Sequence, residues 1–315
     1  MSEMKVAVVG VHVLDTHVLT IESIPAGSEG QLVDTIRFSP AGTAGGTGVV
    51  LSRLGAQVHS FGALGTDPVA DALLGMLEGE GVDTTGLVRK DDVQTSASVI
   101  PVRPNGDRPA WHCIGANAAF TLGDLDLASL DGFTHVHLGG PEFLGGDAAG
   151  QLLAHARSIG ATTSVDLLAP GDPGILEWVA ACLPHADHVL PNDEQLLGLT
   201  GASTLEEGAR VLLEMGAGCV AVTRGAQGAL VVTAEETLEV PAYPIDVVDT
   251  TGCGDAFSAG FLRGLSHGSD LGEAARLGCA TAAQVAQGVG TDHGAYLWAE
   301  IEALVAGVPE EPRTM

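Results

Sequence analysis

The residues with the clearest chemical meaning lie in segment 249–260, which reads Asp-Thr-Thr-Gly-Cys-Gly-Asp-Ala-Phe-Ser-Ala-Gly. Apolar residues from Phe257 to Leu265 recur at helical spacing, so the sequence predicts a helix that begins near Gly254. Free N–H groups at a helix N-terminus bind anions, because the unpaired donors and the helix dipole act together. A carboxylate beside them, Asp255, can accept a proton from an attacking hydroxyl while the amides hold a transferred phosphoryl group. A glycine turn followed by an acidic first helical turn fits the same pattern, and the motif alone leaves both interpretations open.

The elements that must position this motif follow a regular alternation of short apolar runs and helical periodicity. The predicted strands cover 5–9, 57–61, 135–138, 162–166, 188–190 and 219–223, and the predicted helices include 69–80, 147–159, 205–215 and 271–286. This alternation indicates a mostly parallel sheet with helices on both faces. Such a sheet binds ligands at the carboxyl ends of its strands, where the sequence places Gly10, Asp166, Asn192 and Thr223.

Two stretches break the alternation and predict a second, smaller sheet. Residues 31–39 are typical of a strand, and residues 95–102 and 109–114 flank the turn residues 104–107 as a hairpin would. A sheet of so few strands is marginal alone, so we expect it to pack over a substrate cleft or against a partner subunit.

Segment 249–260 also resembles the C-terminal signature of the PfkB/ribokinase family of carbohydrate kinases, Asp-Thr-x-Gly-Ala-Gly-Asp followed by a small-residue helix. The resemblance implies an α/β fold, a ribokinase-like three-layer sandwich with a mostly parallel central sheet and a small β-sheet lid. The kinase domain would cover residues 1–307, with lid segments inserted at about 12–41 and 93–117. The Pro- and Glu-rich residues 308–315 are expected to form a loose C-terminal tail.

The resemblance also assigns roles to residues in the C-terminal half. It makes Asp255 the catalytic base and places the anion hole at Gly252, Cys253 and Gly254. Segment 222–230 matches the family's nucleotide loop, so the residues expected to bind ATP are Asn192, Thr223, Gly225, Gly228 and Gly254. Asp249 and Thr251 match a monovalent-cation site, which makes K⁺ a possible cofactor beside ATP and Mg²⁺.

In the N-terminal half, segment 41–55 resembles the family's Gly-Gly loop running into a helix that ends in Arg-Leu-Gly. The resemblance gives substrate-binding roles to Asp15, Gly42, Thr43, Gly45, Gly46 and Asn117, together with Asp255. Taken without the resemblance, a glycine loop before a helix is common, and Asp15 could equally be an ordinary loop residue. Glu142 is a further candidate carboxylate.

The departures from the family pattern are informative. Ribokinases carry Asn, Lys and Asn where this chain has Val13, Thr43 and Gly46, so we expect ribose to be a poor substrate, because sugars are selected by satisfied hydrogen bonds. Gln195 stands where the family has a Glu that organises Mg²⁺, and Glu194 or Asp166 would have to replace its charge.

Several side chains keep two interpretations. Cys253 could be a reactive thiol whose pKa is lowered by the helix N-terminus, or a small core residue with its sulfur turned inward. Trp111, His112 and Phe120 could stack on a base or a sugar face, or simply pack within the lid.

Composition limits the class of partner. The net charge of −27 argues against nucleic acid and anionic membranes, which require basic patches. The five cysteines are odd in number and widely spaced, which argues against disulfides and favours the cytoplasm. No apolar run is long enough to span a membrane, and the N-terminus does not fit a signal peptide.

His135 and His137 alternate on a strand without a third ligand nearby, which favours packing over zinc.

The sequence therefore predicts an ATP-dependent kinase that phosphorylates an alcohol group of a sugar, a polyol or a similar small molecule, with a possible homodimer through the lid. One alternative is a nucleoside kinase of the same family. The other is a nucleotide- or sugar-binding homologue with weak catalysis, which Gln195 favours and the intact Asp255 motif opposes.

Overall fold

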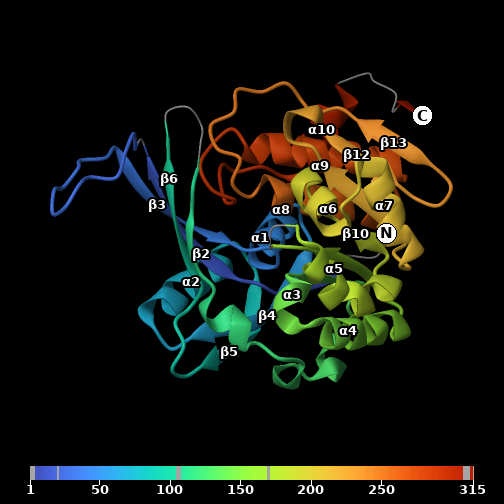
Figure 1. Ribbon diagram of the computed structural model, residues 1–315, viewed down its shortest axis with the longest axis horizontal. Helices are drawn as coiled ribbons and strands as arrows, with labels where there is room; N and C mark the ends of the chain where they lie inside the picture. The colour runs from blue at the N-terminus through green and yellow to red at the C-terminus, as the bar shows by residue number, and fades with distance from the viewer. Residues whose placement is uncertain (1–3, 20, 104–107, 169–170, 308–312, 315) are drawn as a thin grey trace.

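The computed structural model describes residues 4–19, 21–103, 108–168, 171–307 and 313–314, and within them a ten-stranded sheet crosses the body of the molecule (Figure 1). Its strands, in spatial order, are β14 (Arg313–Thr314), β13 (Thr237–Val240), β12 (Ala229–Val232), β11 (Cys219–Thr223), β10 (His188–Val189), β9 (Thr162–Asp166), β8 (His135–Gly139), β1 (Lys5–Gly10), β4 (Gln57–Gly65) and β5 (Asp83–Lys90). Strands β11 to β5 of this order are parallel, and β12, β13 and β14 are antiparallel additions at one edge. The carboxyl ends of the parallel strands therefore meet along one edge, as predicted.

Both faces of this sheet are buried, and β1 shows why. Val6 and Val8 belong to one hydrophobic core, whereas Ala7 and Val9 belong to the other, because successive side chains of a strand point to opposite faces. Parallel strands covered on both sides read as continuous apolar runs, which is why the sequence predicted β1, β4, β8, β9, β10 and β11. The edge strand β5 was not predicted, because its sequence, Asp-Thr-Thr-Gly-Leu-Val-Arg-Lys, is largely polar.

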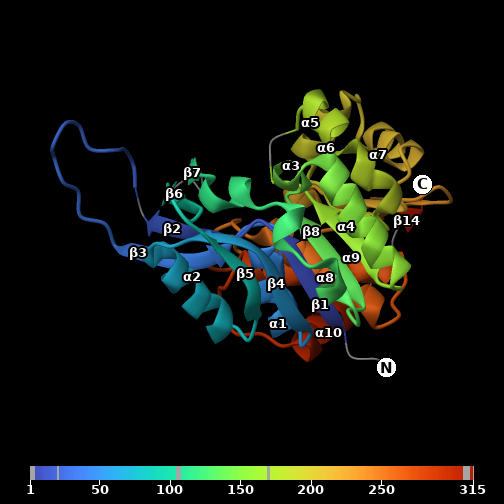
Figure 2. The same cartoon turned by 90° about the horizontal axis from the view of Figure 1, so that it is seen from below.

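The helices divide into two layers, one on each face of the sheet. The first core receives α1 (Gly45–Arg53), α2 (Pro68–Gly79), α8 (Cys253–Ser266), α9 (Leu271–Val285) and α10 (Trp298–Ala306). The second receives α3 (Pro141–Leu144), α4 (Gly146–Ser158), α5 (Pro173–Val179), α6 (Asp193–Thr200), α7 (Leu205–Glu214) and the 3₁₀ turns η1 (Gly115–Ala119), η2 (Leu122–Asp124), η3 (Leu127–Leu130) and η4 (Ala180–His185). Figure 2 shows α4 to α7 on one side of the molecule and α1 and α10 on the other.

A separate four-stranded sheet projects from this body and corresponds to the predicted lid (Figure 1). Its strands, in spatial order, are β3 (Thr35–Ala41), β2 (Val13–Leu19), β6 (Ala97–Val102) and β7 (Trp111–Cys113). The hairpin of β6 and β7 is confirmed, although its predicted turn, 104–107, lies outside the described residues. The strand predicted at 31–39 is shifted: pairing begins at Thr35 and runs on through Pro40, which an edge strand tolerates because its outer N–H needs no partner. β2 itself was not predicted.

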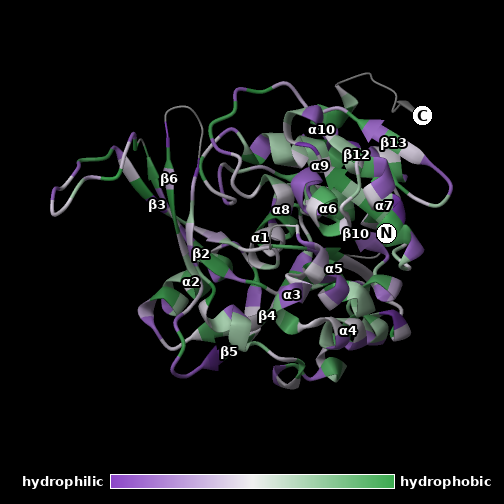
Figure 3. Ribbon diagram, viewed as in Figure 1, coloured by the Kyte–Doolittle hydropathy of each residue, from purple (hydrophilic) through white to green (hydrophobic). Residues whose placement is uncertain are grey.

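The two faces of the lid differ in chemistry. Asp15 lies opposite Ser39 on β3 and Ser98 on β6, and Ser98 lies opposite His112, so these four side chains share the inner face. The other face carries exposed apolar side chains, namely Ile36, Phe38, Val99 and Trp111. Figure 3 shows that the strands of the lid mix hydrophobic and hydrophilic residues. Trp111 therefore points away from the Asp15 face and is exposed, whereas Phe120 packs in the body, so neither ring lies on the Asp15 face.

The end of the chain differs partly from its expected form. Arg313 and Thr314 pair with β13 as the short strand β14, and the remainder of segment 308–315 lies outside the described residues. Among the residues that are described, no helix combines the length and the apolar character needed to cross a bilayer.

Candidate active site

The predicted anion hole lies at the start of α8, which begins at Cys253, one residue before the predicted position. Gly252 precedes the helix with φ of +79°, a conformation that favours glycine, and a Cβ on it would lie 2.2 Å from Thr291 Oγ1. The Cys253 N–H donates to Thr250 O at 3.3 Å, so it is a weaker candidate donor than expected. Gly254 is exposed, with nothing within 4 Å of the position a Cβ would take. The helix start thus faces open space at Gly254.

Asp255 follows in the first turn of α8, and its carboxylate lies against the N-terminal glycine loop. A Cβ built on Gly46 would come within 2.4 Å of Asp255 Oδ2. Burial of the carboxyl raises the pKa of Asp255 well above its usual value, and the nearby Asp166 and Asp15 raise it further. A carboxylate with a raised pKa at a helix N-terminus suits a general base.

Asp166, at the carboxyl end of β9, is the second acid of this site. Its Oδ2 accepts a hydrogen bond from Ser258 Oγ at 3.2 Å, and Ser258 lies one helical turn after Asp255. Burial raises the pKa of Asp166 to about 8, against a smaller opposing effect of the Ser258 bond, and Glu142 adds to the rise. Glu142 itself accepts the N–H of Leu168 at 2.8 Å, so part of its carboxylate is used locally.

Asp15 brings the inner face of the lid to the same place. Burial raises the pKa of Asp15, whereas the Ser98 hydroxyl and the nearby His17 and His112 act in the opposite direction. Ser98 Oγ is also 2.7 Å from His112 Nδ1, so a polar row crosses the lid from β2 to β7. Because Asp15 also raises the pKa of Asp255, the structure brings the predicted substrate carboxylate near the predicted base.

The glycine loop before α1 closely approaches Val11 and His12, which follow β1. A Cβ on Gly42, which has φ of +92°, would lie 2.6 Å from Val11 O, and a Cβ on Gly45 would lie 3.2 Å from the His12 ring. The Thr43 hydroxyl is buried and has no hydrogen-bond partner among the described residues. Glycines that allow such a close approach are typical of a loop that binds a substrate through its backbone.

Asn117 has a structural role that the sequence did not predict. Its amide donates to His12 O at 3.1 Å and to Ser96 Oγ at 2.7 Å, and its Oδ1 accepts from His12 N at 3.2 Å. Both amide donors are therefore occupied, and Asn117 ties the end of the lid to the loop after β1. Its direct contact with substrate stays a prediction.

Four of the five predicted nucleotide residues follow β10 or end or follow β11, whereas the fifth, Gly254, lies at the start of α8. Asn192 pairs with Thr223 through a β-bridge, and Thr223 N donates to Pro191 O at 3.1 Å. Gly225 and Gly228, with φ of +53° and +84°, form the turn η5 (Gly225–Gln227) before β12. Strands in a sheet are about 4.8 Å apart, so Thr223 on β11 lies about 10 Å along this edge from Asp166 on β9.

Two polar side chains near this group are used within the protein. Gln195 forms a reciprocal capping box with Asn192, at 2.8 and 2.9 Å, and donates to Leu167 O at 2.8 Å. Arg224 forms an ion pair with Glu239 at 2.9 Å and donates a hydrogen bond to the Ala229 carbonyl oxygen. Its guanidinium therefore stabilises the hairpin of β11 and β12.

Asp249 holds the loop that precedes α8. Its Oδ1 accepts from Thr251 N at 2.9 Å and Thr251 Oγ1 at 2.8 Å, and its Oδ2 accepts from Gly290 N at 3.1 Å. His17 Nδ1 lies 3.6 Å from Oδ2, and Arg108 Nε lies 4.0 Å from Oδ1. Donors and cationic groups of the protein thus surround this carboxylate on several sides.

Of the two interpretations of Cys253, the structure supports the one in which the sulfur is turned inward. Burial raises the pKa of Cys253 to about 12, and the thiol lies 3.7 Å from Ala282 O of α9. The sulfur is therefore turned toward the neighbouring helix, because tertiary packing outweighs the local helix N-terminus.

His135 and His137 are buried and both contact Ser164 Oγ, at 2.7 and 2.8 Å, as core packing would require. Within the described residues no group of three or more His, Cys, Asp or Glu side chains could hold a metal ion.

Comparison with known proteins identifies the family. The sequence profile described as pfkB family carbohydrate kinase matches residues 4–296. This chain belongs to that family. The pfkB family chain is 30% identical over 250 residues to a protein of Archaeoglobus fulgidus described as an uncharacterized sugar kinase, and the match covers 78% of this chain and 97% of the relative. It is 28% identical to the aminoimidazole riboside kinase of Salmonella typhimurium, covering 72% and 74% of the two chains.

The same family supplies similar solved structures. A protein of E. coli described as a candidate ribokinase II, solved in complex with ATP and Mg²⁺, superposes with a TM-score of 0.84. The superposition covers 98% of this chain and all of that one at 23% identity. The ribokinase-like fold predicted from the sequence is thereby confirmed, and the chain is a kinase of the pfkB family.

Several contacts around the site were missed by sequence reasoning. His17 could have been found, because it lies two residues after Asp15 and so shares its face of a strand. Thr291 and Asp292 gave no local signal, since their partners lie more than 30 residues away in the sequence.

Proposed function

We propose that this protein transfers the terminal phosphoryl group of ATP to an alcohol group of a sugar or a sugar-like small molecule. The observation that carries the proposal is the contact of Asp255 with Gly46, because it joins the helix start that would hold a phosphoryl group to the loop that would hold an acceptor. Asp255 takes the proton of the attacking hydroxyl, and the amides at the start of α8 hold the charge that develops on the phosphoryl oxygens. Asp15 orients the acceptor from the lid.

Asp255 must be deprotonated to act, and its raised pKa makes it a stronger base than an ordinary carboxylate. Burial is the largest cause of this rise, and Asp166 and Asp15 raise the pKa of Asp255 further when they are ionised. Mg²⁺ belongs to the proposal, because it neutralises phosphate charge and is usually bound by phosphates and only one or two carboxylates. Asp166, at the strand edge between the Asp255 and Thr223 groups, is the carboxylate that fits this requirement best.

The acceptor is proposed to be something other than ribose. The side chains of Val13, Thr43 and Gly46 carry a single polar atom, the Thr43 hydroxyl, and that hydroxyl is buried. The test is an ADP-release panel of sugars, polyols and nucleosides, with the phosphorylated product identified by mass spectrometry. Turnover of a sugar or polyol above the ATP-only background supports the proposal. Ribose with the highest kcat/KM would contradict the choice of acceptor, and the absence of any phosphorylated product would contradict the function.

A nucleoside is the second candidate acceptor. One relative is named as an aminoimidazole riboside kinase, and His112 on the inner face of the lid offers a ring beside Ser98. Preference for nucleosides over sugars in the same panel would select this alternative. Tight ATP binding without turnover of any acceptor would instead select the weakly catalytic homologue.

Potassium dependence stays a prediction, and the contacts of Asp249 argue against it. Asp249 already accepts three hydrogen bonds, from Thr251 and Gly290, with His17 and Arg108 beside it. These contacts do not favour a further cation at the carboxylate, because three hydrogen-bond donors and the Arg108 guanidinium already surround it. Equal rates in potassium and sodium salts are the result that this geometry favours.

We also propose that the exposed apolar face of the lid, carrying Ile36, Phe38, Val99 and Trp111, packs against a second copy of this chain. The lid projects from the body, so its outer face is accessible to a partner (Figure 2). Sedimentation analysis should find a dimer that Phe38→Asp dissociates.

The cytoplasm remains the expected location, and the five free cysteines agree with a reducing compartment.

A further inference from the structure

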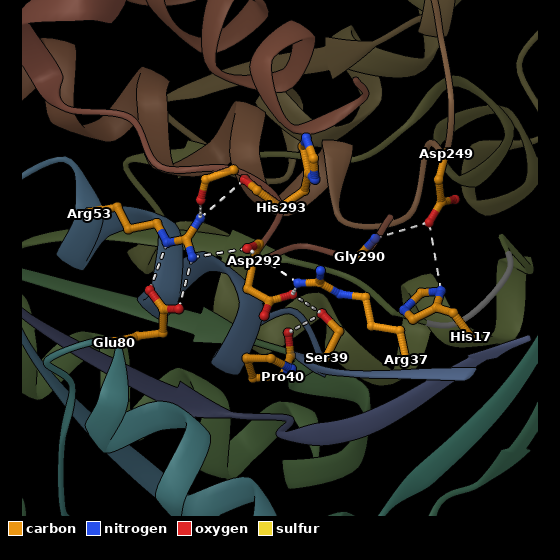
Figure 4. Close-up of polar contacts among 11 residues, drawn as sticks. His17, Arg37, Ser39, Pro40, Arg53, Glu80, Asp249, Gly290, Asp292 and His293 are labelled. Atoms are coloured by element: carbon orange, nitrogen blue, oxygen red, sulfur yellow. Dashed lines mark hydrogen bonds and ion pairs between the residues drawn. The ribbon is translucent and has the colours of Figure 1, made fainter. Parts of the chain in front are cut away.

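Segment 290–292 lies between the lid and the start of α8 and contacts both (Figure 4). It follows α9, far in sequence from the lid strands and from the glycine loop. None of its residues is among the catalytic, substrate-binding or nucleotide-binding residues predicted from the sequence.

On the side of α8, two residues of the segment hold the anion-hole loop. Gly290 N donates to Asp249 Oδ2 at 3.1 Å, which fixes the carboxylate that also accepts from Thr251. Thr291 is fully buried, and its Oγ1 would lie 2.2 Å from a Cβ on Gly252, so it packs directly against the residue before the helix. The position of the anion hole therefore depends on the position of this segment.

On the lid side, the Asp292 side chain holds strand β3. Its Oδ1 lies 2.7 Å from Arg37 Nη2 and accepts a hydrogen bond from Ser39 Oγ at 2.7 Å. Ser39 is the register partner of Asp15, and Arg37 is the register partner of His17, whose ring is 3.6 Å from Asp249. The lid strands thus contact the anion-hole loop by two routes.

The backbone of the segment has a separate anchor on the body. Asp292 O accepts from Arg53 Nη2 at 2.9 Å, and Arg53 also donates to the carbonyls of His293 and Gly294 at 3.1 and 2.7 Å. Glu80 holds the same guanidinium at 2.6 and 2.8 Å (Figure 4). Removal of the Asp292 carboxylate would therefore abolish its contacts with Arg37 and Ser39 without freeing the segment, and would leave only the 3.4 Å bond from Arg37 Nη2 to Asp292 O on this route.

We propose that Asp292 is a positioning residue that couples the lid to the anion hole, so that occupation of the anion hole orders the lid strand that carries the acceptor site. Its carboxylate holds β3, while its neighbours Gly290 and Thr291 hold the loop before α8. The coupling rests on the proposed function, because it assigns the nucleotide phosphates to the start of α8.

Hydrogen–deuterium exchange of the full chain with Mg²⁺ and a non-hydrolysable ATP analogue tests this coupling without knowledge of the acceptor. In the wild type the analogue should slow exchange both in the first turn of α8 and in β2 and β3. In Asp292→Ala the slowing at α8 should persist, while the slowing in β2 and β3 should fall by about fivefold, the factor that corresponds to about 1 kcal/mol of coupling. Arg37→Met should reproduce this loss from the lid side, which keeps the test decisive if Asp292→Ala folds poorly.

The matched control is Arg210→Ala, which removes an exposed ion pair with Glu206 on α7 at 2.6 Å. It should leave both responses at wild-type values, because a surface pair contributes little. Equal slowing of β2 and β3 in the wild type, Asp292→Ala and Arg37→Met would overturn the inference, even if the variants were less stable. Failure of the analogue to slow exchange at α8 in the wild type would contradict the proposed function itself.

Discussion

Replacement of Gly46 by alanine should displace the Asp255 carboxylate while the rest of the fold stays intact. A Cβ at this position would lie 2.4 Å from Asp255 Oδ2 and 2.8 Å from its Cγ, and contacts below 3.0 Å do not occur for real Cβ atoms. The oxygen would have to retreat by about 1 Å to reach ordinary contact, and a misplacement of that size can cost about 100-fold in rate. We therefore expect kcat to fall about 100-fold, equivalent to about 2.7 kcal/mol of transition-state stabilisation.

The assay is steady-state turnover with the best acceptor of the panel, together with calorimetric titration of ATP. ATP affinity should stay within a few-fold of wild type, since Gly46 lies on the acceptor side. Gly75→Ala is the matched control, because Gly75 lies inside α2 with nothing within 4 Å of its Cβ position. That variant should keep full activity and gain about 0.5–1 kcal/mol of stability. Wild-type kcat in Gly46→Ala would refute the geometry, because it would mean that Asp255 is not held against the glycine loop during turnover.

Three further outcomes follow from the same site. Asp15→Ala should raise the KM of the acceptor far more than that of ATP, and equal effects on both would remove Asp15 from the acceptor site. Asp166 has a pKa of about 8 in the folded protein and 3.8 when unfolded, so the folded state holds the extra proton and this group makes stability fall as pH rises from about 4 to about 8. Asp166→Asn should reduce this pH dependence of the free energy of unfolding by up to about 1.4 kcal/mol per pH unit. Urea unfolding at pH 5 and pH 7.5 measures the free energy at the two pH values. An unchanged difference between them would show that Asp166 does not cause the pH dependence. Cys253 should be alkylated more slowly at pH 7.5 than the exposed Cys113, because burial raises its pKa to about 12, and rapid labelling of Cys253 in peptide mass spectra would contradict its inward orientation.

The parts of the fold that sequence predicted well are those whose signals are local. The start of α8 was placed within one residue, because glycines at 252 and 254 precede apolar residues at helical spacing. The parallel strands other than β5 were recognised by their short apolar runs. β2 was missed because its buried Asp15 and His17 face the site rather than an apolar core, so the strand does not read as hydrophobic.

The contacts that complete the site depend on tertiary structure. Ser39 and Asp292 are 253 residues apart in sequence, and no pattern near either one indicates the other. Cys253 shows the opposite error: the local rule for a helix N-terminus lowers a thiol pKa, but packing against α9 buries the sulfur and raises it. Asn117 matched a family motif, yet only the structure shows that its amide donors bind His12 and Ser96.

The most direct test of the central claim is the turnover of Asp255→Asn. Asparagine keeps the size of the side chain and removes the base, so kcat for phosphoryl transfer should fall by at least about 100-fold. ATP should still bind, with a dissociation constant close to that of the wild type by calorimetry. A variant that retains more than about a tenth of wild-type turnover would contradict the assignment of Asp255 as the base.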